Sequence, residues 1–151
     1  MANTSITYHD LGTLRKLVFR WTANHLGTVA ATTRRIRGVL IKGITDANVG
    51  WTDEDWSPST TLSVSASPEP TDNYDIVITD EEGVDVLGNC DDDLLDRDEA
   101  TTEEVYFLID DAGGTTTSVQ PAVADKLTIT VTNAGNGGTG ELHLYYYSHD
   151  I

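Results

Sequence analysis

The sequence has very little cysteine and no long apolar run. Cys90 is the single cysteine among 151 residues, so neither an intrachain disulfide nor a cysteine-rich metal site can form. We expect synthesis in a reducing cytoplasm. No apolar stretch approaches the ~20 residues of a membrane span, and residues 1–5 lack the basic and apolar pattern that opens a secretory signal. The sequence therefore predicts neither a membrane segment nor a signal peptide.

Basic residues are scarce after residue 43. Residues 44–151 contain 24 acids against Arg97 and Lys126, a net charge of −22. Residues 1–43 contain the other seven bases against Asp10, a net charge of +6. A surface this acidic repels nucleic acid, so no nucleic-acid partner is expected. The seven bases face an acidic partner, or they are neutralised in part by the domain itself or by a sister subunit.

The motifs of common active sites are also missing. The four histidines have no metal-binding spacing, and no serine lies in a Gly-x-Ser-x-Gly setting. Cys90 has no nearby histidine, and the charge of Asp91 disfavours a reactive thiolate. The glycines of residues 135–140 are not followed by a helix, so they do not form a phosphate-binding loop. We expect a protein without enzymatic activity and without a cofactor.

Two acidic clusters, residues 80–85 and 91–98, are candidates for a calcium site because calcium prefers several oxygen ligands. Neither cluster fits the EF-hand pattern: counted from Asp91, the sixth position is Asp96 where that pattern needs glycine. We expect solvated surface carboxylates and no metal ion. A structural calcium in an extracellular domain stays open as an alternative.

Short runs in which apolar and polar residues alternate predict an all-β fold. In residues 73–88 a strand is followed by the turn 80–83, where Gly83 supplies a positive φ, and by a second apolar run. Residues 91–99 are the best helix candidate, one or two turns long. Residues 3–9 form a short first strand, or residues 1–13 form an N-terminal arm. The other predicted strands are residues 14–21, 32–44, 60–66, 104–110, 118–123, 127–132 and 141–147. Residues 1–151 are thus predicted to form one antiparallel β-sandwich or jelly roll of about eight strands with one short helix.

Exposed aromatic residues suggest a second kind of partner. Trp51 and Trp56 lie in a predicted loop, residues 46–58, where burial of both rings over the core is favoured over a contact role. If the rings project, they and Tyr145 and Tyr147 would suit the stacking surface of a carbohydrate-binding module. The positions of these rings cannot be derived from the sequence.

Three parts of the sequence together resemble small virion structural proteins of tailed bacteriophages. The first is residues 70–87, PTDNYDIVITDEEGVDVL, with its Tyr-Asp, its Asp-x-x-Gly turn and its apolar ending. The second is KLTITVTNAG at 126–135 with GELHLYYY at 140–147, and the third is FRW at 19–21 with GVL at 38–40. The resemblance implies a jelly-roll or sandwich protein on the outside of the capsid or at the head–tail region. It brings no catalytic residue.

The resemblance and the charge distribution lead to one hypothesis. A capsid decoration (cement) protein bridges neighbouring capsomers, often as a homotrimer, and would bind the major capsid protein or another virion protein at the virion surface. The basic segment would face the capsid or a sister subunit, and the acidic part would face solvent. The candidate contact residues are Arg15, Lys16, Arg20, Arg34, Arg35, Arg37, Lys42, Trp51 and Trp56. The alternative is a carbohydrate-binding or adhesion β-sandwich of a phage tail or an extracellular protein.

Overall fold

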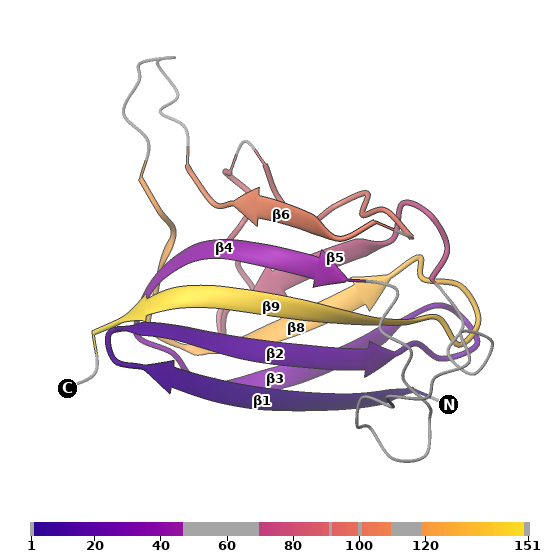
Figure 1. Ribbon diagram of the computed structural model, residues 1–151, viewed down its shortest axis with the longest axis horizontal. Helices are drawn as coiled ribbons and strands as arrows, with labels where there is room; N and C mark the ends of the chain where they lie inside the picture. Colours follow the sequence, from indigo (N-terminus) through magenta and orange to yellow (C-terminus); the bar gives the residue numbers. More distant parts are fainter. Residues whose placement is uncertain (1, 47–69, 91, 100, 110–118, 150–151) are drawn as a thin grey trace.

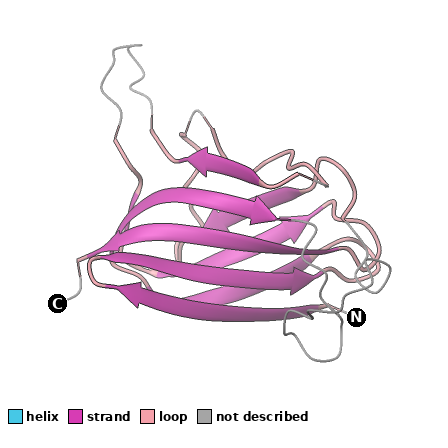
Figure 2. Cartoon of the chain, in the orientation of Figure 1, coloured by secondary structure: helices cyan, strands magenta, loops and turns pink. Residues whose placement is uncertain are grey.

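A computed structural model describes residues 2–46, 70–90, 92–99, 101–109 and 119–149. These residues form an all-β sandwich of nine strands and contain no helix (Figure 2). The strands are β1 (Asn3–Leu11), β2 (Leu14–Thr22), β3 (Val29–Arg35), β4 (Gly38–Asp46), β5 (Asp75–Thr79), β6 (Glu103–Tyr106), β7 (Ala122–Val123), β8 (Lys126–Thr132) and β9 (Thr139–Ser148). The predicted antiparallel β-sandwich is confirmed.

The strands form two antiparallel sheets. The six-stranded sheet has the order β1-β2-β9-β4-β6, with β7 also paired to β4, and the three-stranded sheet has the order β3-β8-β5. Figure 1 shows the larger sheet in front, with β6 highest and β1 lowest, and the smaller sheet behind it. β9 lies at the centre of the larger sheet, between β2 and β4.

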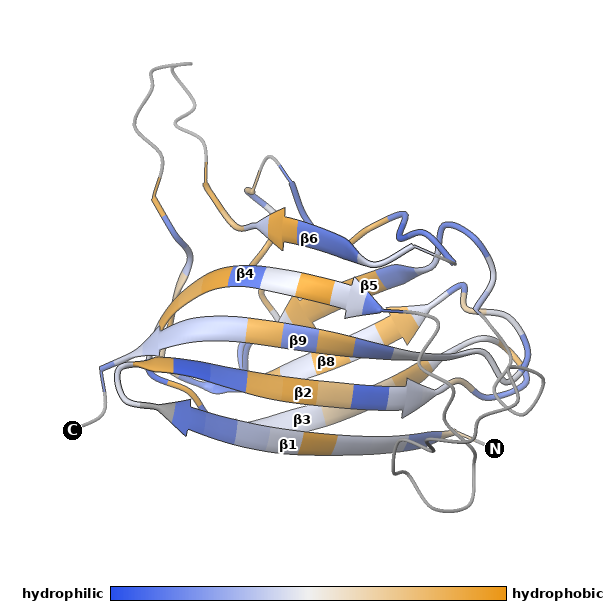
Figure 3. Ribbon diagram, viewed as in Figure 1, coloured by the Kyte–Doolittle hydropathy of each residue, from blue (hydrophilic) through white to orange (hydrophobic). Residues whose placement is uncertain are grey.

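The core lies between the sheets and follows the period of two of the strands. Along β9, for example, apolar and polar residues alternate (Figure 3). On β2, the side chains of Leu17, Phe19 and Trp21 are fully buried, and the Trp21 ring lies 5.4 Å from that of Tyr74. β8 contributes the facing side chains in the same alternation, Leu127, Ile129 and Val131. Removing these apolar groups from water is the main term that stabilises the sandwich.

The predicted helix at residues 91–99 is wrong. The described part of this segment consists of bends and one isolated bridge, between Arg97 and Tyr74. The Leu94 carbonyl accepts a hydrogen bond from Ile76 N at 2.9 Å, and Arg97 N donates to Tyr74 O at 2.8 Å. Leu94 is fully buried. Because the segment uses its backbone groups to cover the edge of β5, they are not available for helical hydrogen bonds.

Two other predictions need correction. The single strand region predicted at 32–44 is two strands, β3 and β4, which belong to opposite sheets. Ile36 and Arg37 connect them. In the predicted hairpin of residues 73–88, β5 and the turn at Gly83 (φ 82°) are confirmed. The second arm makes only a bridge from Asp85 to Thr79 before it turns away. Of the two interpretations of the N-terminus, residues 3–11 form a strand, β1.

Candidate binding face on the six-stranded sheet

The outward side of the six-stranded sheet carries one continuous row of tyrosine and lysine side chains. Lys16 on β2 is paired with Tyr145 on β9, which is paired with Lys42 on β4, which is paired with Tyr106 on β6. We call these four residues the tyrosine–lysine row. Since directly opposite residues in antiparallel strands project on the same side, the row crosses four strands on one surface.

The ammonium groups of the row lie over the tyrosine rings. The Lys42 Nζ atom is 4.9 Å from the ring centroid of Tyr145 and 5.5 Å from that of Tyr106, and the Lys16 Nζ atom is 5.6 Å from that of Tyr145. These are distances at which a cation is attracted to an aromatic face. Lys42 also contacts Glu104 at 3.3 Å. The Tyr106 hydroxyl, and then Lys42, hold the pKa of Glu104 below its usual value, so this carboxylate stays charged.

A β-bulge gives Lys42 its outward position. In the ladder with β9, Leu40 is paired with Tyr146 and Lys42 with Tyr145, so Ile41 is one extra residue. Without the extra residue, Lys42 would face the core, because each one-residue shift turns a side chain to the other side of the sheet. The register shift therefore lies between Gly38 and Gly43.

An apolar row lies beside the tyrosine–lysine row. On β9, Tyr147 is paired with Leu14 of β2 and with Val39 of β4, and Val39 is paired with Ala122 of β7. Tyr147 is 45 % exposed and Tyr106 is 53 % exposed. Exposed tyrosines with neighbouring aliphatic groups are typical of protein–protein contact surfaces. We call the two rows together the outer face.

The other end of the same surface contains a buried carboxylate. The Glu141 side chain is only 9 % exposed; it accepts a hydrogen bond from Arg20 Nε at 3.1 Å and lies in hydrogen-bond contact with His143. Burial alone would raise the pKa of Glu141, but the hydrogen bonds from His143 and Arg20 outweigh it, so the pKa lies below its usual value of 4.5. Arg20 therefore has a structural partner on this surface.

Glu141→Gln is expected to lower the free energy of unfolding at pH 7 by about 2 kcal/mol, because it removes charge-assisted hydrogen bonds in a desolvated site. A carboxyl group whose pKa is lower in the folded state stabilises the fold above its unfolded pKa and loses that contribution as pH falls through the folded pKa. The difference between wild type and variant should therefore shrink below about pH 4.5. Urea unfolding of both proteins at pH 7 and pH 3.5 measures this. An equal difference at both pH values would contradict it.

The structure neutralises most of the predicted basic residues within the domain. Asp10 lies 3.6 Å from Arg15 and 3.2 Å from Arg34. The Arg34 guanidinium also lies 4.0 Å from the ring centroid of Tyr8, and Arg34 N donates to the Tyr8 hydroxyl at 2.8 Å. Arg15 and Arg34 thus connect β1, β2 and β3. The predicted internal neutralisation is confirmed for these two residues, as it is for Arg20 and Lys42.

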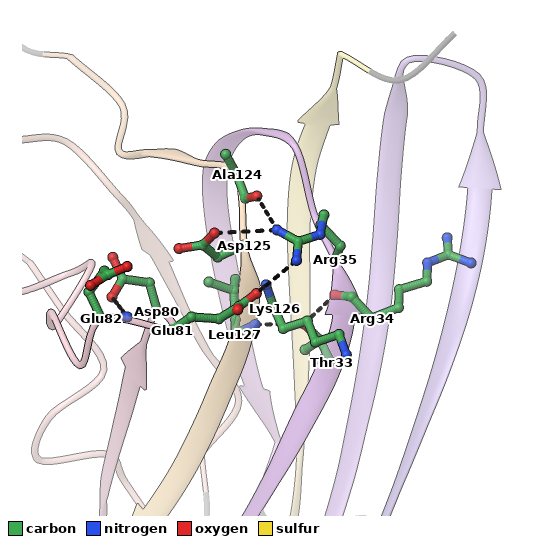
Figure 4. A network of polar contacts seen from close by, with 10 residues as sticks. All are labelled: Thr33, Arg34, Arg35, Asp80, Glu81, Glu82, Ala124, Asp125, Lys126 and Leu127. Atoms are coloured by element: carbon green, nitrogen blue, oxygen red, sulfur yellow. Dashed lines mark hydrogen bonds and ion pairs between the residues drawn. The ribbon is translucent and has the colours of Figure 1, made fainter.

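Arg35 links three separate segments (Figure 4). It donates to Ala124 O at 3.1 Å, and it forms ion pairs with Asp125 at 3.4 Å and with Glu81 at 3.2 Å. Glu81 also accepts a hydrogen bond from Lys126 N at 3.0 Å. Arg34 and Arg35 point to opposite sides of β3. Because Arg35 holds the 80–83 turn against the start of β8, its role in the described residues is structural.

Lys16 and Arg37 are the predicted bases without a carboxylate partner among the described residues. Lys16 contacts the Tyr145 ring, and Arg37 is exposed and has no side-chain partner in the described part of the chain. Trp51 and Trp56 lie outside the described residues. The predicted basic contact surface is therefore a mixed one, which combines Lys16 and Lys42 with the Glu104 carboxylate and the exposed Tyr106.

The acidic clusters have roles in turns. In the 80–85 turn, Asp80 Oδ1 accepts hydrogen bonds from Glu82 N at 2.9 Å and Val84 N at 3.0 Å. Within the described ranges no group of three histidine, cysteine or acidic side chains is close enough together to hold a metal ion.

The same ranges contain no helix long and apolar enough to cross a membrane.

One open cavity of about 550 Å³ lies between the start of β1 and the smaller sheet. Its lining is small and uncharged: Ala2, Asn3, Thr4, Asn24, Thr28, Val29, Ala30 and Thr130. The side-chain oxygen of Asn24 already accepts hydrogen bonds from Leu26 N and from Thr28. The described residues of the lining therefore offer no charged group to a ligand.

Tyr106 is the contact candidate that sequence reasoning missed. The alternation of residues 104–110 already placed Tyr106 opposite the buried Val105, which was the available signal. What the sequence did not show is that β6 lies next to β4, which brings Tyr106 to Lys42. Comparison of the chain with protein-family models, with curated proteins and with solved structures found no match.

Proposed function

We propose that this chain is a non-enzymatic virion structural protein, a capsid decoration protein that binds a phage head through the outer face of its six-stranded sheet. The observation that carries the proposal is the tyrosine–lysine row beside an exposed apolar row on one sheet surface. Tyrosine and aliphatic groups supply contact area at little conformational cost, and the paired charges supply orientation. The partner would be the major capsid protein or another virion protein.

The distribution of acidic residues supports a defined orientation on the particle. Residues 72–99 contain 12 acids, and this segment includes β5 and the chain that covers its edge. β5 belongs to the smaller sheet, on the side of the sandwich opposite the outer face, and the other described residues of the segment run along the edge of β5. With the outer face on the capsid, these carboxylates face solvent, where they limit association between particles.

The test is binding to phage heads purified from particles that lack this protein. Wild-type protein should sediment with the heads, and the double variant Tyr106→Ala/Tyr145→Ala should bind at least roughly tenfold more weakly, as expected for central tyrosine anchors. The matched control is Thr79→Ala/Thr128→Ala on the outward side of the smaller sheet, which should bind like wild type. Absence of the wild-type protein from heads and from purified virions, by mass spectrometry, would refute the proposal.

The same surface supports the alternative of a carbohydrate-binding or adhesion module. Tyr145 and Tyr147 alternate on β9 and Tyr106 lies across the sheet, so rings on one surface are available for stacking on sugars. Binding to a glycan array that is lost in Tyr145→Ala and in Trp51→Ala, together with no binding to heads, would favour this alternative.

A further inference from the structure

The outer strand of the larger sheet, β1, has a free edge. It is paired with β2 over its full length, from Asn3 opposite Thr22 to Leu11 opposite Leu14. No residue of β1 makes a backbone hydrogen bond to any segment other than β2 in the described part of the chain. In Figure 1, β1 is the lowest strand of the front sheet, with no labelled strand below it. Half of its backbone groups therefore point away from the fold.

The geometry of the turn that joins β1 to β2 shows which backbone groups of β1 point away from β2. Gly12 has a φ of 79° in a two-residue loop, which is the geometry of a type II′ hairpin whose flanking pair, Leu11 and Leu14, is hydrogen-bonded. Hydrogen-bonded and free positions then alternate along the strand. The N–H and C=O groups of Thr4, Ile6, Tyr8 and Asp10 point to the free edge. Consistently, Thr4 N donates to the Asn3 side chain and not to β2.

The other outer strands are protected, and β1 is not. The edge of β5 is covered by the chain at Asp85, Leu94 and Arg97. β3 carries a register shift between Thr32 and Arg35, and β6 and β7 are only four and two residues long. Natural proteins prevent an edge strand from pairing with another chain by means of β-bulges, charged side chains, proline or a short strand length. β1 has nine residues, no bulge in its ladder with β2, no proline and no lysine or arginine.

We propose that β1 pairs with β1 of a second copy of this chain, antiparallel, about a two-fold axis through Thr7. Thr7 is the middle of the strand, so this register pairs all nine residues. It places Ile6 opposite Tyr8 and Thr4 opposite Asp10, so every outward N–H and C=O finds a partner, since residues with outward groups face one another. An aliphatic side chain thus meets an aromatic one, and no like charges are opposed.

Charge also favours a second copy at this edge. The single acid of β1, Asp10, already has two arginine partners, whereas residues 44–151 carry a net charge of −22. Two copies that approach at β1 therefore bring together strands with one neutralised acid each, so that repulsion at the contact is small. The pairing extends the six-stranded sheet into one continuous sheet. It differs from the trimer that the resemblance implies, and it does not depend on capsid binding.

The dimer is tested by sedimentation velocity over a concentration series. Wild-type protein should show a concentration-dependent dimer. Thr7 is exposed, so Thr7→Lys and Thr7→Glu should fold, and each places like charges opposite one another across the axis and should raise the dissociation constant roughly fivefold. The matched control Thr32→Lys, on the exposed part of β3, should leave the dimer unchanged.

Mixing the two variants gives the decisive measurement. Lysine opposite glutamate should restore association, so the mixture should form heterodimers more tightly than either variant forms homodimers. Circular dichroism of each variant checks that the sandwich is retained. The proposal is overturned if wild type stays monomeric up to about 1 mM, if it forms a trimer that Thr7→Lys does not change, or if the mixture associates no better than the separate variants.

Discussion

Replacing Trp21 with alanine is expected to lower the free energy of unfolding by about 3–5 kcal/mol. Trp21 is fully buried, and its ring fills the space between the sheets next to Tyr74 and over the backbone of Gly140. The substitution removes the largest buried side chain of the described residues and leaves a cavity that the neighbouring strands cannot close. The loss is a large fraction of the ~5–15 kcal/mol that a domain of this kind has in total. Urea unfolding followed by circular dichroism measures it.

Two control variants separate core packing from other effects. Trp21→Phe should cost clearly less than Trp21→Ala, because the indole Nε1–H has no hydrogen-bond partner among the described residues and none is lost. Tyr145→Ala removes a half-buried ring from the outward side of the sheet and should also cost less. If Trp21→Ala cost no more than Tyr145→Ala, the Trp21 ring would not lie in the core.

Gly38→Ala is expected to destabilise the protein by at least about 3 kcal/mol. A Cβ atom at Gly38 would lie 1.8 Å from the carbonyl oxygen of Tyr147, and the φ of Gly38 is 155°. The main chain cannot move aside, because Gly38 is paired with Ser148 of β9 and with Val123 of β7. The chain crosses from the smaller to the larger sheet just before this residue. A lower urea midpoint with an unchanged slope would show the loss.

Gly83→Ala is the matched control for Gly38→Ala. Gly83 also has a positive φ, 82°, but a Cβ atom there would meet nothing within 4 Å. This variant therefore carries the backbone strain alone and should cost only about 1–2 kcal/mol. Equal losses in the two variants would show that strain, and not contact with Tyr147, decides the effect at Gly38.

The outer face was partly predictable. The alternation along β2 separates Lys16 and Arg20 from the buried Leu17 and Phe19, and alternation along β9 gives Tyr145 and Tyr147 a common side. These inferences need only the two-residue period of a strand. The sequence did not show that Lys42 is turned outward, because the extra residue Ile41 is a property of the ladder between β4 and β9. A bulge is specified by the partner strand as much as by its own residues.

The predicted helix at 91–99 failed for a related reason. Three aspartates at its start favour a helix N-terminus, and this local preference amounts to less than about 1 kcal/mol per residue. Burial of Leu94 and the hydrogen bonds from the segment to β5 outweigh it. A local sequence pattern does not reveal long-range contacts of this kind. Here they determine that the segment lies along the edge of β5 and does not form a helix.

The sequence by itself determined the fold class and the faces of the strands that have no bulge, because burial of alternating side chains there depends only on residues close in the chain. The sequence also determined the uneven distribution of charge along the chain, but not which charged side chains pair with one another. Only the tertiary structure decided that Arg15 and Arg34 are neutralised by Asp10 and that Arg35 clamps the 80–83 turn. It also decided that Lys16, Tyr145, Lys42 and Tyr106 form one row. Apart from Asp10 and Arg15, which face each other in one hairpin, those partners lie tens of residues apart, and the strand order brings them within contact distance.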